Sequence, residues 1–201
     1  MAFVTFVNLP LIDGFCPNTE QFSWTKTKTY YNNTHPEDIL GPAANLKCSI
    51  HHWSTAGGIA GRGILLDYRT YAQRHNIVYD PHVPYSIPYS DLVDCGKEQG
   101  IDIRPAAVGG DIKIGDMLFI RAGFVERYYE KSDAEREMMG TEKFMGSNGT
   151  HDGGAWAGVE QSEEMKTWLH DCYFATVAGD QPAFECFPPQ KGEFTLIYAV
   201  V

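Results

Sequence analysis

Four residues in the C-terminal half of the sequence are of types that suit acid–base or metal chemistry. His151 lies in a run rich in glycine, asparagine and serine, where an imidazole can bind a metal ion or act as a general base. Glu163 and Glu164 open a predicted helix. Asp180 directly follows a predicted strand, a place where α/β folds often carry functional groups. We therefore take these residues as candidates for a metal-binding or catalytic site.

Each candidate also has a purely structural explanation. A histidine in a loop can simply be exposed, and an acidic residue in the first turn of a helix is stabilised by the helix dipole. Asp180 can cap a turn instead of contacting a substrate. The residue types and their spacing leave both interpretations open.

Other motifs exclude several kinds of site. The glycines of residues 57–63 precede a predicted strand, and no Lys-Ser or Lys-Thr follows them, which excludes a typical phosphate-binding loop. His51 and His52 are neighbours that would point to opposite faces of a strand, so they are poorly arranged to bind one ion. The 5 cysteines are widely spaced and include no Cys-x-x-Cys pair, which argues against structural zinc and against a disulfide framework.

Apolar patterning predicts the elements that position these residues. Short apolar runs bounded by glycine or polar residues predict buried strands over residues 64–68, 117–120 and 174–178. Amphipathic segments predict helices over residues 90–100, 131–139 and 162–173. Ser162 is the expected N-cap of the last helix, and residues 141–154 are expected to form a loop. Strands and helices at this spacing indicate an α/β or α+β domain.

The net charge excludes some partners. The sequence has 16 Lys and Arg residues against 26 Asp and Glu residues, a formal net charge of −10, and no window holds a basic cluster. Nucleic acid and anionic membranes attract basic faces, so neither is expected as a partner. No apolar run approaches the roughly 18 residues of a membrane span, and residues 1–10 lack the basic start of a signal peptide. We expect a cytoplasmic protein that acts on a small molecule.

Four segments occur in an order that resembles the cyclase family, which includes bacterial kynurenine formamidases and isatin hydrolases, and particularly its longer fungal branch. They are Gly-Ile-Ala-Gly-Arg-Gly-Ile-Leu-Leu-Asp-Tyr at 58–68, Ile-Gly-Asp-Met-Leu-Phe-Ile-Arg-Ala-Gly-Phe at 114–124, Trp-Ala-Gly-Val-Glu-Gln-Ser-Glu-Glu at 156–164 and Val-Ala-Gly-Asp-Gln-Pro at 177–182. The resemblance implies a swivelling β/α/β-type α/β fold with a mixed central sheet. It also implies a hydrolase or cyclisation enzyme that uses zinc or manganese on an amide or lactam. The expected substrate is a small aromatic or polyketide-like metabolite, in fungal secondary metabolism, and the expected assembly is a homo-oligomer.

The resemblance also suggests roles for individual residues. Glu164 matches a glutamate that binds the metal in the family, because Trp168-Leu169 follows it at the matching spacing. His151 lies near the position of a loop histidine of the family, about one residue out of register, and the resemblance implies that it binds the metal or catalyses. Asp180 is expected to be a further catalytic residue.

The N-terminal part departs from the family pattern. The fungal branch carries an aspartate and a histidine shortly after a tryptophan, whereas Trp24 is followed directly by Thr25-Lys26-Thr27, and His35 comes too late. We therefore expect an irregular segment with a degenerate metal motif over residues 1–49. A cyclase-like α/β domain, shortened at its C-terminus, is expected over residues 50–201. The alternative function is a non-catalytic, metal-free relative that serves binding or assembly.

Overall fold

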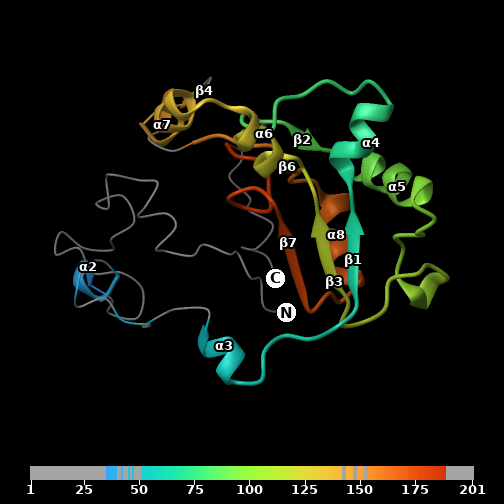
Figure 1. The fold of residues 1–201 in the computed structure, drawn as a ribbon. Helices are drawn as coiled ribbons and strands as arrows, with labels where there is room; N and C mark the ends of the chain where they lie inside the picture. Colours follow the sequence, from blue (N-terminus) through green and yellow to red (C-terminus); the bar gives the residue numbers. More distant parts are fainter. Residues whose placement is uncertain are drawn as a thin grey trace. The chain divides into compact units, whose positions relative to one another are not determined.

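The structure is a computed structural model, and it describes residues 35–39, 42, 45, 47, 51–141, 144–146, 149–151 and 154–188 (Figure 1). The chain divides into a unit of residues 7–60 and a unit that contains residues 1–6 and 61–201. Helices α2 (Pro36–Ile39) and α3 (His51–Thr55) belong to the first unit. His51 and His52 thus lie in one helical turn and not on a strand. The degenerate metal motif and the C-terminal end lie outside the described residues.

A parallel sheet forms the centre of the second unit. Its strands, in spatial order, are β1 (Gly63–Leu66), β3 (Met117–Ile120) and β7 (Thr176–Gly179). Both pairings are parallel, and Ile64, Leu118 and Val177 lie side by side in the register. These strands come from the three apolar runs in the sequence, so the predicted α/β class is confirmed. The described strands of this central sheet are parallel throughout.

Three helices and one face of the sheet share a hydrophobic core. The helices are α4 (Tyr68–Arg74), α5 (Tyr89–Glu98) and α8 (Glu163–Asp171). Figure 1 shows α8 running along the sheet beside β3 and β7. The core joins alternate strand residues to the inner side of each helix, which is why these side chains are buried: Ile64, Leu66, Tyr68, Leu92, Leu118, Ile120, Met165, Leu169 and Val177.

The start of α8 follows directly from the sequence. Ser162 Oγ accepts a hydrogen bond from the backbone N of Met165 at 3.2 Å, as expected of an N-cap. Met165, Trp168 and Leu169 are buried against the core. The predicted amphipathic stripe therefore decides which side of α8 faces the sheet and which side remains open to solvent.

Short elements complete the second unit. They are the parallel pair β2 (Ser86–Ile87) and β6 (Gly158–Val159), and helices η3 (Ala106–Val108), α6 (Phe124–Glu130) and α7 (Asp133–Thr141). In addition, β4 (Phe144–Gly146) and β5 (Gly149–His151) form an antiparallel pair. The predicted loop over 141–154 is therefore wrong at these strands, because a segment rich in glycine and asparagine is compatible with paired strands as well as with an open loop. No helix among the described residues is long and apolar enough to cross a membrane.

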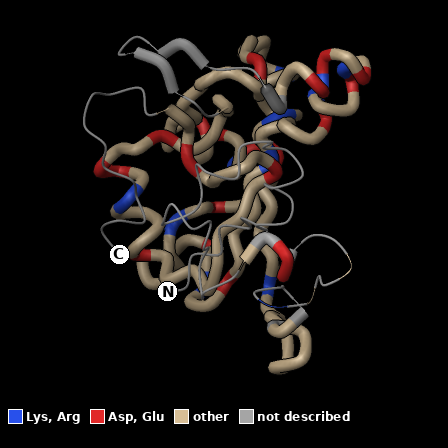
Figure 2. Tube along the Cα trace, turned by 90° about the vertical axis from the view of Figure 1, so that its left-hand side faces the viewer, with Lys and Arg blue, Asp and Glu red and all other residues tan. Residues whose placement is uncertain are grey.

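Acidic and basic residues are interspersed along the described trace (Figure 2). An ion pair between the buried Asp116 and the partly exposed Arg62 fixes the turn before β3. Asp116 is 3% exposed, and it accepts hydrogen bonds from Arg62 Nε at 2.8 Å and from the backbone N of Lys113 at 2.7 Å. The hydrogen bonds from Arg62 hold the pKa of Asp116 below its ordinary value, although burial opposes them. Because Arg62 directly precedes β1, this pair ties together the starts of two neighbouring strands.

We predict that Asp116→Asn lowers the free energy of unfolding by about 1–3 kcal/mol at neutral pH, because it leaves one partner of the pair without its counterion. The pKa of Asp116 is lower in the folded state, so its contribution is complete above the unfolded value of 3.8 and is lost as the pH falls through the folded value. Urea unfolding should therefore show a smaller difference between variant and wild type at about pH 3 than at about pH 7.

The matched control is Asp133→Asn. The Asp133 side chain is 98% exposed and pairs with Arg136 only at the surface of α7. This variant should leave the unfolding midpoint nearly unchanged at both pH values. Equal effects of the two substitutions at neutral pH would contradict the role assigned to Asp116.

Candidate functional site

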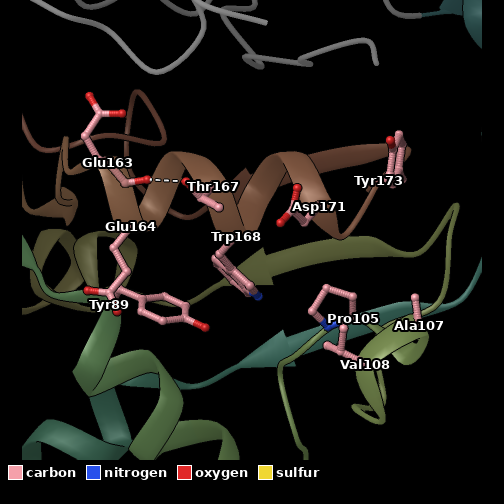
Figure 3. Close-up of a pocket in the computed structure, with 10 residues that line it drawn as sticks. All are labelled: Tyr89, Pro105, Ala107, Val108, Glu163, Glu164, Thr167, Trp168, Asp171 and Tyr173. Carbon is pink, nitrogen blue, oxygen red and sulfur yellow. Dashed lines mark hydrogen bonds between the residues drawn. The ribbon is translucent and has the colours of Figure 1, made fainter.

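The outer side of α8 lines a pocket of about 670 Å³ (Figure 3). The opposite wall comes from the start of α5 and from the segment around η3. The pocket combines aromatic and aliphatic side chains with acidic ones. Its lining residues are Tyr89, Pro105, Ala107, Val108, Glu163, Glu164, Thr167, Trp168, Asp171 and Tyr173.

The aromatic wall of this pocket is held firmly. The rings of Tyr89 and Trp168 lie 5.5 Å apart between centroids, and Trp168 Nε1 donates a hydrogen bond to Ile103 O at 2.7 Å. The backbone N of Tyr89 donates to Glu160 Oε1 at 3.0 Å. Burial raises the pKa of the Tyr89 hydroxyl, with Glu164 as a further cause, so this hydroxyl is neutral at physiological pH.

Three acidic residues of α8 line the pocket, and they differ in their partners. Glu163 forms an ion pair with Lys166, and Asp171 Oδ1 lies 3.0 Å from His170 Nδ1. In Figure 3 the Glu163 side chain points away from Tyr89, whereas Glu164 extends toward it. Within the described part of the chain, the Glu164 carboxylate has neither a hydrogen bond nor an ion pair. Glu164 is therefore the acid of this pocket that is most available to a bound molecule.

The described residues do not fit the metal site that the family resemblance implies. Nowhere among them do three His, Cys, Asp or Glu side chains come together in a way that could hold a metal ion. His75 pairs with Glu98, and His82 Nε2 contacts the carbonyl oxygen of Phe124 at 3.0 Å. The backbone of His151 lies in β5, but its side chain is outside the described part. Its role, like that of Glu164 as a metal ligand, stays a prediction.

Asp180 lies at the carboxyl end of β7, where the sequence suggests a functional group. Its Oδ1 accepts hydrogen bonds from the backbone N of Ala122 at 2.6 Å and of Gly123 at 3.2 Å, and its Oδ2 accepts one from Val125 N at 3.4 Å. Because Gly123 is the N-cap of α6, Asp180 neutralises the start of this helix. The structure thus gives Asp180 a positioning role, and a catalytic role stays a prediction.

Paired charges fill the carboxyl ends of β1 and β3, where α/β folds often bind ligands. Arg121 Nη1 donates to Asp67 Oδ1 at 2.7 Å, and Arg121 Nη2 donates to Glu126. Arg69 Nε also donates to Glu126, at 3.2 Å. Since each of these charges has a counterion, this cluster leaves no unpaired charge for a ligand.

No pattern in the sequence predicts which residues face α8 across the pocket. Tyr89 and the η3 segment lie far from α8 in the chain, and nothing local connects them to it. One signal within α8 was available. Glu164, Trp168 and Asp171 recur at positions i, i+4 and i+7, which places them on the same side of the helix.

We predict that Asp180→Asn lowers the free energy of unfolding by about 1–2 kcal/mol, because it removes the negative charge that accepts three backbone hydrogen bonds. Urea denaturation followed by circular dichroism measures this change. Asp171→Asn serves as a control, since that carboxylate is exposed on α8 and should change stability little. An Asp180 variant as stable as wild type would contradict the positioning role.

The sequence matches no protein-family model and no curated protein. Among solved structures, the fold is similar to a crystal structure described as that of a novel cyclase, with 21% sequence identity and a TM-score of 0.47. The similarity covers 85% of this chain but 47% of the other, so this chain spans about half the length of that cyclase.

Proposed function

We propose that this chain is a cyclase-family α/β protein that binds a small aromatic metabolite in the α8 pocket. An aryl amide, a lactam or a polyketide-like molecule is the expected class. One observation carries the proposal: Glu164, the residue that resembles the functional glutamate of the family, lines the same pocket as the rings of Tyr89 and Trp168. The resemblance to the fungal branch supports a role in secondary metabolism.

The chemistry of the pocket suits such a ligand. Small-molecule sites are concave and largely apolar, with a few polar groups that fix the orientation of the ligand. Here Tyr89, Trp168, Pro105 and Val108 provide the apolar surface, and the Glu164 carboxylate provides an acceptor. A flat ring is the shape that gains most from contact with fixed aromatic side chains.

Hydrolysis of the bound metabolite is a second candidate function. The Glu164 carboxylate favours it, because it has no hydrogen bond or ion pair among the described residues and is exposed at the pocket. Zinc or manganese is the proposed cofactor, with Glu164 and His151 as its ligands and with His151 and Asp180 as catalytic residues. The described residues supply no complete ligand set for such an ion.

The binding function is tested by calorimetric titration with indole and isatin as neutral aromatic probes. Val108 is 63% exposed, so Val108→Asp should fold normally while it places a charge in the apolar wall. We predict that this variant binds the probes at least about 5-fold more weakly than wild type. Tyr129→Ala removes an exposed ring on α6, outside the lining residues, and should leave affinity unchanged. If wild type binds neither probe, or if both variants behave alike, the α8 pocket is not the binding site.

The hydrolytic function is tested by metal analysis and by isatin hydrolysis with the purified protein. This second function requires stoichiometric zinc or manganese in the wild-type protein, and loss of both metal and turnover in Glu164→Ala. Glu163→Ala is the matched control, because its side chain points away from Tyr89 and should not affect either quantity. A metal-free wild-type protein that still binds the probes would leave the binding function in place and would exclude metal-dependent hydrolysis.

A further inference from the structure

The charged side chains that line the α8 pocket are all acidic. Its lining includes three acidic residues, and none of its described lining residues is basic. Lys166 is paired with Glu163 and Arg104 with Asp102, so among the described residues the Glu164 carboxylate is the lining charge without an ion pair. A molecule that enters this pocket therefore meets a negative potential.

The acids are also arranged around the apolar surface. Glu164 and Asp171 are seven residues apart on α8, which separates them by roughly 10 Å along the helix axis. Trp168 lies between them on the same side, and Tyr89 lies next to Glu164 (Figure 3). A ligand in contact with the aromatic wall thus lies within reach of a carboxylate.

From this arrangement we infer that the natural ligand is an organic cation, an aromatic molecule that carries a protonated amine. The inference rests on the proposed binding function and adds the charge of the ligand to it. The ammonium group pairs with the Glu164 carboxylate, while the ring contacts Tyr89, Trp168 and the apolar residues near η3. Aromatic faces and carboxylates both attract ammonium groups. An aromatic carboxylate of the same size meets repulsion at the same position.

Three probes with one ring system test the charge directly. Tryptamine carries an ammonium group, tryptophol is neutral, and indole-3-acetate is an anion. Each is titrated calorimetrically into the full chain at low ionic strength in the presence of a chelator, so that no divalent ion competes for Glu164. Because the pocket is open to solvent, tryptamine should bind roughly 3- to 10-fold more tightly than tryptophol, with indole-3-acetate the weakest.

Variants assign this preference to one carboxylate. Glu164→Gln keeps the size of the side chain and removes its charge, so tryptamine and tryptophol should then bind equally. Glu163→Gln is the control and should keep most of the preference, because that carboxylate is paired with Lys166. Raising the salt concentration should reduce the preference in wild type and should have little effect in Glu164→Gln.

The possible outcomes separate the two proposals. If all three probes bind equally well, or if indole-3-acetate binds best, the inference about charge is wrong while the aromatic-binding function stands. A preference for tryptamine that survives Glu164→Gln also overturns the assignment to this residue. If none of the probes binds wild type, the proposed function fails as well.

Discussion

The contacts of the Trp168 indole hold the candidate site together. Its ring centroid lies 5.6 Å from that of Phe174, in an edge-to-face arrangement, and 5.5 Å from that of Tyr89. Its N–H donates a hydrogen bond to the Ile103 carbonyl oxygen. One side chain thereby connects α8, α5 and the segment before η3. These are the elements that form the walls of the pocket. The geometry of the pocket therefore depends on the same packing that closes the core above the parallel sheet.

The carboxylates of this protein differ in their contacts, and this difference is the second constraint on the candidate site. Asp116 is paired with Arg62, Asp67 with Arg121, and Asp180 with three backbone N–H groups. Each of them ties one segment of the fold to another, and its contacts explain its presence. Glu164 has no such contact within the described structure, although it lies beside a fixed aromatic wall. Its place in the first turn of α8 suits a negative charge, and its oxygens have no hydrogen-bond partner among the described residues, which is why we assign it to ligand binding.

The sequence could predict the local elements of this fold, but not which residues far apart in the chain come into contact. The strands and α8 follow from short apolar runs and from an amphipathic stripe that begins at Ser162, because these patterns are set by neighbouring residues. The partners of Asp180 are backbone groups at 122–125, which no pattern in the sequence marks. Tyr89 likewise becomes part of the site only through tertiary packing. The same limit explains the antiparallel pair β4 and β5, because a glycine-rich sequence fits more than one local structure.

Tyr173 lines one end of the pocket, and its position there is set by the backbone at the end of α8. It follows the C-cap of α8 and has a φ of 50°, a left-handed conformation in which glycine is usual at this position. A residue with a side chain pays about 1 kcal/mol for this backbone compared with glycine. The residue is 57% exposed, but its ring lies 5.7 Å from the His170 ring between centroids, and its carbonyl oxygen accepts a hydrogen bond from Gly115 N at 3.0 Å. Contacts within the fold therefore hold this backbone, and they fix the ring at the edge of the pocket, where a bound molecule can reach it.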